Sequence, residues 1–157
     1  MTKIVLISDI HSNLEAFESV LEAYKSEGID KFLCIGDIVG YGANPKECIE
    51  IIRERNIVAV AGNHDWASTG KLSIDYFNSH AKEAVLWTKE RIDEQEKSFL
   101  NNLDLIYRES NFCLVHGTLI EPNNFYYMFE LEDARDSFKV MDTAICFVGH
   151  THSPVTF

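Results

Sequence analysis

The sequence has few basic residues. Lys and Arg together number 14 against 25 Asp and Glu, so the 157-residue chain carries a formal net charge of −11. Non-specific binding to nucleic acid, or to an anionic membrane surface, requires patches of Lys and Arg that this chain lacks. We therefore exclude both kinds of surface. A small anionic substrate stays open, provided that bound metal supplies the positive charge.

Cysteine is also scarce, and its spacing excludes several kinds of site. The four cysteines form no CxxC pair, and three of them lie inside apolar runs, where a free thiol behaves as a small apolar side chain. We expect neither disulfides nor thiolate metal ligands, which is consistent with a reducing compartment. The first apolar run, residues 4–7, is too short for a signal peptide or a membrane span. These features predict a cytoplasmic protein without a membrane segment.

No repeat, low-complexity tract or Pro/Gly-rich linker divides the sequence. Apolar residues make up 46% and charged residues 25%, the balance of an ordinary globular protein. A chain of 157 residues is close to the commonest domain size, so we expect a single domain spanning residues 1–157.

Short apolar runs predict the β-strands. Each run is continuous rather than alternating, which is typical of strands buried on both faces of a largely parallel sheet. Helical patterns separate the runs, so the predicted fold class is α/β. The runs are Ile4–Ile7, Phe32–Ile35, Ile57–Val60, Phe112–Val115 and Ile145–Val148.

The helical patterns predict helices on both sides of the sheet. The first begins at Ser12, with Glu15 completing a capping box, and ends at Gly28. The second has Asn44 as its N-cap and Pro45 at its first helical position, with a further capping box. Three more helices are expected at residues 79–92, 94–103 and 131–140.

Polar side chains follow every apolar run at the point where the strand should end. Because the carboxyl ends of parallel strands meet at one edge of a sheet, we expect these distant segments to converge. Glycines accompany them where the backbone must turn sharply or approach a ligand closely. The polar residues are Asp9 and His11; Asp37; Asn63, His64 and Asp65; His116; and His150 and His152.

Five of the six histidines belong to this set, and only His80 lies elsewhere, on a predicted helix. Taken singly, each residue is better explained as a helix cap or a turn residue than as a metal ligand. Taken together they favour a metal site, because buried charges without a partner or a metal are costly. Imidazole and carboxylate ligands without thiolates suit transition metals such as manganese, iron, zinc or cobalt, rather than calcium.

The order of the motifs, DxH, GD, GNHD, H and GHTH, resembles that of the calcineurin-like metallophosphoesterases over nearly the whole chain. The phrase GDIVGYGANP, residues 36–45, is similar to small bacterial and archaeal phosphodiesterase-type members. The resemblance implies a sandwich with largely parallel core strands flanked by helices. Only residues 153–157 follow the last motif, so we expect a second sheet truncated at the C-terminus, or an edge covered by another subunit in a homo-oligomer.

The resemblance also implies a role for each residue. His64 corresponds to the catalytic histidine, and Asp65 is its candidate partner. Two divalent ions are expected per chain, manganese first, with iron, zinc, nickel or cobalt as alternatives. Substrate-binding residues are not identified, and Tyr41 and Asn13 are left outside the predicted site. The implied ligands are Asp9, His11 and His152 for one ion, Asn63, His116 and His150 for the other, and Asp37 as the bridge between them.

Such a centre hydrolyses phosphomonoesters or phosphodiesters with a bridging hydroxide, and we favour the phosphodiester. His64 would stabilise the transition state or donate a proton to the departing alkoxide. The expected substrate is a small phosphate ester, with nucleotides among the candidates. The alternative is a protein-interaction scaffold or a regulatory protein with little turnover, since a retromer subunit uses this fold as a platform. The presence of His64 beside every expected ligand favours the enzyme.

Overall fold

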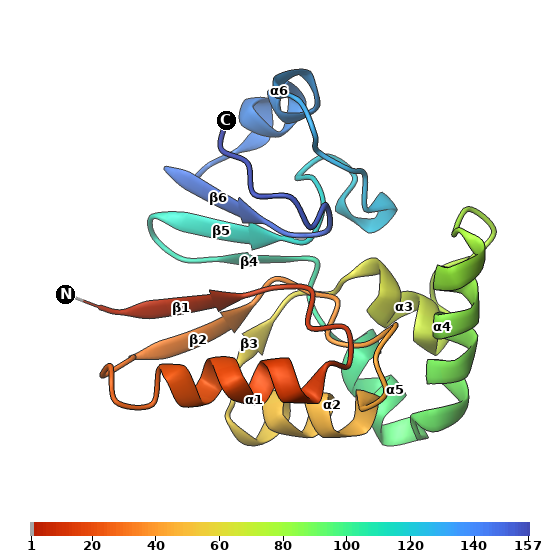
Figure 1. Ribbon diagram of the computed structural model, residues 1–157. Coiled ribbons are helices and arrows are strands. Elements are labelled where there is room, and N and C mark those ends of the chain that lie inside the picture. Colours follow the sequence, from red (N-terminus) through yellow and green to blue (C-terminus); the bar gives the residue numbers. More distant parts are fainter. Residues whose placement is uncertain (1) are drawn as a thin grey trace.

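The computed structural model describes residues 2–157 and contains two three-stranded sheets (Figure 1). In the first sheet, β1 (Ile4–Ile7), β2 (Lys31–Cys34) and β3 (Val58–Ala59) are parallel and lie in that order. A helix connects each strand to the next, because parallel neighbours cannot be joined by a tight turn.

The second sheet is mixed. β4 (Ile106–Arg108) pairs antiparallel with β5 (Phe112–Val115), and β5 pairs in parallel with β6 (Ile145–Val148). β6 is its edge strand, and residues 153–157 after it form no strand in the described chain. The five predicted strands are confirmed within one or two residues of their ends. β4 was not predicted, because a three-residue strand is too short to show a period.

The two sheets pack face to face. Leu33 and Ile35 from the first sheet share one buried cluster with Leu114 of β5, and the rings of Phe112 and Phe147 join it in an edge-to-face pair with centroids 5.8 Å apart. This packing explains why the runs are apolar without alternation: one face of each strand meets the other sheet, and the opposite face meets helices.

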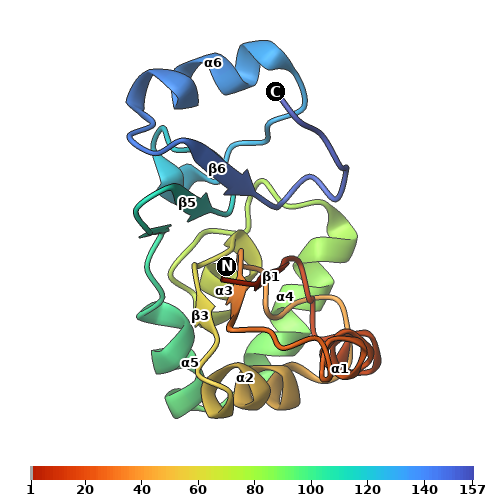
Figure 2. The ribbon, with the colours of Figure 1, turned by 90° about the vertical axis from the view of Figure 1, so that its left-hand side faces the viewer.

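Helices cover the outer face of each sheet, as the two views show (Figures 1 and 2). The prediction of an α/β sandwich is confirmed. The prediction that helices cover both faces of one sheet was wrong, because the strands divide into two sheets and each sheet covers the inner face of the other. The helices are α1 (Leu14–Ala23), α2 (Pro45–Glu54) and α5 (Glu94–Asn101) on the first sheet, α6 (Leu131–Val140) on the second, and α3 (Asn63–Thr69) and α4 (Ser79–Arg91) beyond the strand ends, with a 3₁₀ turn at Pro122–Asn124.

Two predicted helix starts differ from those in the structure. The N-cap of α1 is Asn13, whose side chain accepts a hydrogen bond from the Ala16 N–H at 3.1 Å, whereas Ser12 is buried outside the helix. The capping box expected at Ser12 was therefore wrong. Asn44 does precede α2, but its side chain makes no capping hydrogen bond, so the second box is not formed either. The two loops are instead hydrogen-bonded to each other, with the Ser12 N–H donating to the Ile38 carbonyl at 2.9 Å and the Asn44 N–H donating to the Ser12 carbonyl at 3.1 Å.

Among residues 2–157, no helix combines the length and apolar content that a membrane crossing needs. The four cysteines are free thiols; Cys34 and Cys113 of the apolar runs are buried, Cys146 of the last run is only partly buried, and Cys48 is buried on α2. The prediction of one domain stays a prediction.

The packing between the sheets predicts a large loss of stability on truncation of Leu114. This side chain is fully buried, so Leu114→Ala should lower the free energy of unfolding by about 3 kcal/mol. Leu86→Ala makes the same change on α4, where the side chain is 52% exposed, and should cost less than about 1 kcal/mol. Urea unfolding followed by circular dichroism measures both. Equal losses would contradict the face-to-face packing.

Candidate metal centre

The eight predicted site residues converge at one end of the molecule. They follow the carboxyl ends of β1, β2, β5 and β6 and begin α3, which comes after β3 (Figure 1). Both sheets contribute, so the site lies where the sandwich ends rather than at the edge of one sheet. All are buried or partly buried except His152, whose side chain is 54% exposed.

Most of these residues lie in a strained backbone conformation. Asp9, His11, Asp37, His150 and His152 all have positive φ angles, between +49° and +68°. A non-glycine residue in this left-handed region costs about 1–2 kcal/mol. Hydrogen bonds between the loops hold the conformation, such as Asp9 N–H to the Gly36 carbonyl at 3.1 Å and His11 N–H to the Asp37 carbonyl at 2.9 Å. Such strain clusters at functional sites because it aims side chains that a regular strand could not.

One group of donor atoms comes from the two ends of the chain. Ligand atoms of Asp9, His11 and His152 all lie within 4.8 Å of one another. The Nε2 atoms of the two histidines are 3.1 Å apart, and His152 Nε2 is 3.3 Å from Asp9 Oδ1. Two imidazole nitrogens and a carboxylate at these distances can bind a divalent transition metal.

A second group lies deeper between the sheets. Ligand atoms of Asp37, His116 and His150 again lie within 4.8 Å of one another. His116 Nε2 is 3.2 Å from Asp37 Oδ2 and 3.2 Å from Asn63 Oδ1, which adds the amide oxygen to the group. Asp37 Oδ2 is also 3.7 Å from His11 Nε2, so this carboxylate lies between the two groups.

Backbone carbonyls orient two of the imidazoles. His116 Nδ1 is 2.7 Å from the Ile35 carbonyl oxygen, and His11 Nδ1 is 3.1 Å from that of Val39. A carbonyl only accepts, so Nδ1 carries the proton in each ring and Nε2 faces the centre. His150 Nε2 is buried and has no hydrogen-bond partner among residues 2–157. A buried nitrogen without a partner is costly unless it binds a metal, so these residues fit a metal site.

The electrostatics of the group are dominated by Asp37. Burial opposes ionisation, but His116 holds the pKa of the Asp37 carboxyl well below its usual range. Although burial also disfavours charged His116, the Asp37 carboxylate raises its pKa to about 9. Burial, with His116 nearby, lowers the pKa of His150 to about 4. His150 is thus neutral at pH 7, the form that binds metal, whereas a metal would displace a proton from His116.

His64 lies beside the metal ligands and is enclosed by aromatic rings. Its backbone N–H donates to Asp37 Oδ1 at 2.8 Å, and its ring centroid is 4.7 Å from that of Tyr41 and 5.2 Å from that of Phe77. Burial lowers the pKa of His64 to about 4, so the imidazole is neutral at pH 7. One nitrogen of His64 also lies within 4.8 Å of donors from His11 and Asp37.

Asp65 does not orient the His64 side chain. Its two carboxylate oxygens accept hydrogen bonds from the backbone N–H groups of Gly62 (2.9 Å) and Val39 (3.1 Å). Burial, followed by repulsion from Asp37, raises its pKa to about 7. Asp65 therefore ties the start of α3 to the loop after β2, and the partnership with His64 that we considered is not formed.

Sequence reasoning missed the aromatic side chains around the site. Tyr127 stacks on His150 with ring centroids 3.9 Å apart and an interplanar angle of 18°. Tyr41, left outside the predicted site, contacts both His11 and His64. These tyrosines lie in loops, where no periodic pattern marks a residue as part of a site. The only signal in the sequence was the presence of aromatic residues. His80 lies on a helix, α4, as predicted, and is exposed there.

Close packing around Asp37 yields a prediction for Gly62. Its φ is −102°, which any residue adopts, but a Cβ there would overlap the Asp37 carboxylate and backbone nitrogen. Gly62→Ala should lower the free energy of unfolding by about 3 kcal/mol and weaken metal binding. Gly28→Ala is the control, because its Cβ would meet nothing within 4 Å and only its φ of +63° costs about 1 kcal/mol. Urea unfolding and metal titration compare the two, and equal effects would refute this steric account.

Comparison with known proteins gives three informative similarities. An uncharacterized protein of Methanocaldococcus jannaschii is 46% identical over 155 residues, which cover 96% of this chain and 63% of that protein. The crystal structure of a metallophosphoesterase from Sphaerobacter thermophilus superposes with a TM-score of 0.82 at 39% identity, covering 98% of this chain and 62% of that one. Phosphodiesterase YfcE of Escherichia coli is 24% identical over 165 residues, covering 99% of this chain and 72% of that protein.

The chain thus spans less than two thirds of the length of the first two relatives. The similarity nevertheless includes all the strands that supply the candidate site. The family model described as the calcineurin-like phosphoesterase superfamily domain matches residues 2–157. The match agrees with the histidine and aspartate side chains that are placed at the strand ends to bind metal. This chain therefore belongs to the calcineurin-like phosphoesterase superfamily.

Proposed function

We propose that the protein is a metal-dependent hydrolase of phosphate esters that binds two divalent ions per chain, manganese first, with iron, zinc, nickel or cobalt as alternatives. The observation that carries the proposal is the pair of donor groups on either side of the Asp37 carboxylate. The buried, unpartnered His150 Nε2 in the deeper group supports it further. We favour phosphodiesters over phosphomonoesters, and the similarity to a phosphodiesterase of Escherichia coli supports this preference.

In this proposal the donor groups divide the ligands between two ions. Asp37 contributes to both. Divalent ions held there would supply positive charge to a bound phosphate and lower the pKa of a water nucleophile. The proposed ligands are Asp9, His11 and His152 for the first ion, and Asn63, His116 and His150 for the second.

His64 is proposed to act on the substrate directly. Its ring lines a pocket beside the donor groups, and at pH 7 it is neutral, with one N–H to donate. Such a donor can bind a phosphoryl oxygen as negative charge develops in the transition state. Donation of a full proton to the leaving group requires the charged form, which burial disfavours, so we assign His64 mainly as a hydrogen-bond donor.

The acidic composition of the chain bears on which cofactor and substrate we propose. With a net charge of −11, the protein attracts an anion only where metal reverses the local charge, so activity should depend completely on divalent ions. We propose a small phosphate ester as substrate, a nucleotide among the candidates, and a cytoplasmic location. A homo-oligomer in solution is also proposed.

Substitution of His64 tests the enzyme. His64→Ala should bind metal as the unaltered protein does, yet hydrolyse bis-p-nitrophenyl phosphate at least about 100-fold more slowly. His80→Ala is the matched control, because this exposed histidine lies outside the donor groups. Turnover is followed by p-nitrophenolate absorbance after manganese is added to stripped protein, and p-nitrophenyl phosphate is assayed in parallel. Loss of metal from His64→Ala would contradict its role, and metal binding without turnover in the unaltered protein would favour a scaffold.

Metal should also stabilise the fold. Manganese at about 100 times the dissociation constant of each proposed ion site should raise the free energy of unfolding by about 2.7 kcal/mol per site, or about 5.4 kcal/mol for two sites. In His150→Ala about half of this increment should disappear, because the second ion loses a proposed ligand while the first ion keeps its own, whereas His80→Ala should keep all of it. The increment is measured within each protein by thermal unfolding with and without metal, so differences in basal stability cancel. An increment that persists in full in His150→Ala would remove this residue from the ligand set.

A further inference from the structure

A pocket of about 330 Å³ adjoins the candidate metal centre. Its inner wall is made by three side chains of the proposed machinery: Asn63, His64 and His150. A phosphate held at the donor groups would therefore project one of its ester substituents into this pocket. The volume lies at the lower end of the range for small-molecule sites and suits one ring-bearing group rather than a polymer.

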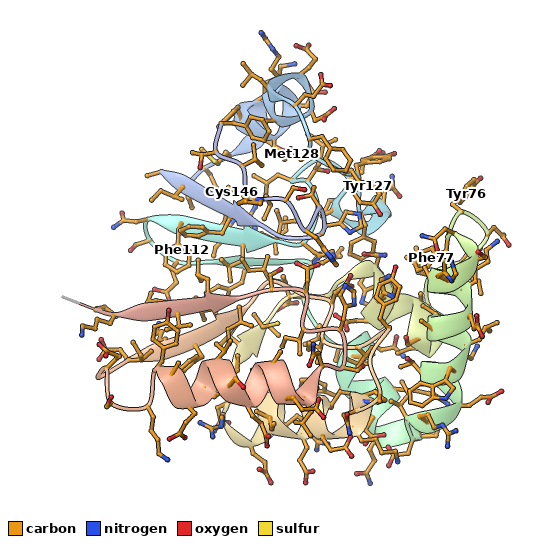
Figure 3. The ribbon with its side chains drawn as sticks, in the orientation of Figure 1. Tyr76, Phe77, Phe112, Tyr127, Met128 and Cys146 are labelled. Atoms are coloured by element: carbon orange, nitrogen blue, oxygen red, sulfur yellow. The ribbon has the colours of Figure 1, made fainter. Side chains whose placement is uncertain are left out.

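Aromatic rings form the side walls of the pocket. Phe77 approaches from the loop between α3 and α4, and Tyr127 from the segment before α6, on the other side of the opening (Figure 3). Both rings are fixed by aromatic neighbours. The Phe77 centroid is 5.2 Å from that of His64, and Tyr127 stacks on His150 and also on Phe129, at 5.4 Å and 9°. Rings held in place before binding lose little freedom when a ligand arrives.

The pocket carries no fixed charge. Among its lining residues, all within the described part of the chain, there is no Lys, Arg, Asp or Glu. Its polar side chains outside the proposed machinery are neutral, such as those of Ser73, Asn78 and Asn124. A substituent with its own anion would find no cation there and would face a protein of net charge −11. A neutral substituent with a polar edge would meet both aromatic rings and hydrogen-bonding groups.

We infer that this pocket binds the alcohol part of the phosphate ester, and that this part is a neutral, planar ring compound of about nucleoside size. The inference rests on the proposed function, which places the phosphate at the adjoining donor groups. A nucleoside and a simple aryl group share this chemistry. Substrates with a second anionic group on this side of the reacting phosphate, such as polyphosphates, are excluded.

Phosphonates test the inference without turnover, because their C–P bond is not hydrolysed. Calorimetric titration of the manganese-loaded protein compares methylphosphonate, cyclohexylphosphonate, phenylphosphonate and 4-carboxyphenylphosphonate. Phenylphosphonate should bind about tenfold more tightly than methylphosphonate and about threefold more tightly than the non-planar cyclohexyl compound. The added carboxylate should weaken binding at least about fivefold. A methylenephosphonate analogue of a nucleoside monophosphate that binds more tightly than phenylphosphonate indicates a nucleoside, and weaker binding indicates a simpler aryl group.

Substitutions in the pocket walls locate the effect. Phe77→Leu and Tyr127→Leu keep apolar bulk but remove a planar ring, so each should reduce the phenyl-to-methyl affinity ratio from about tenfold to about threefold. The ratio is taken within one protein, so any change in metal or headgroup binding cancels. Tyr24→Leu, at the end of α1 remote from the centre, makes the same change on an exposed tyrosine and should leave the ratio unaltered.

The outcomes separate this inference from the proposed function. Methylphosphonate that binds only with metal, with no gain for the phenyl compound, would overturn the inference and leave the hydrolase standing. A ring gain that survives both Phe77→Leu and Tyr127→Leu would also overturn it, because the ring would bind elsewhere. Failure of every phosphonate to bind metal-loaded protein would overturn the proposed function, and the inference with it.

Discussion

The buried carboxylate of Asp37 is the group on which the rest of this structure depends. It follows β2 in the first sheet and contacts His116, which follows β5 in the second, at 3.2 Å. Burial of a carboxylate is costly, and the cost is offset by this contact and by the His64 backbone N–H. The pair therefore joins the open ends of the two sheets and places the two donor groups on either side of one anion.

The backbone around this carboxylate is shaped to bring ligands toward it. The left-handed residues after β1, β2 and β6 end the alternation of side chains between the two faces of a strand, and their donor atoms gather at the candidate metal centre. Gly62 leaves space for the Asp37 carboxylate, and Asp65 holds the same loop through two backbone N–H groups. Strain in the turns after β1 and β2 is thus balanced by hydrogen bonds between loops of the first sheet, and the His150 N–H, which donates to Asp9 Oδ1 at 3.2 Å, links the turn after β6 to them.

The distribution of charge and of aromatic rings gives the site two distinct parts. Histidines and carboxylates occupy the gap between the sheets, where a cation can bind. Neutral and aromatic residues from the loop before α4 and the segment before α6 form the pocket beside it. In the proposed function, this division lets an acidic protein hold the phosphate of a substrate at bound metal and the remainder of the substrate in an uncharged pocket.

Five of the six strands, and the polar residues at their ends, could be predicted from the amino-acid sequence. Four-residue apolar runs followed by Gly, Asp and His carry that information locally, because strand burial and chain reversal each require particular residue types in a short segment. Tertiary structure alone decided that the strands divide into two sheets, that Asn13 rather than Ser12 caps α1, that Asp65 binds backbone rather than His64, and that Phe77 and Tyr127 flank a pocket. These features depend on contacts between segments far apart in the chain and in loops without periodicity, and no local pattern of residues records which distant surface a loop side chain will meet.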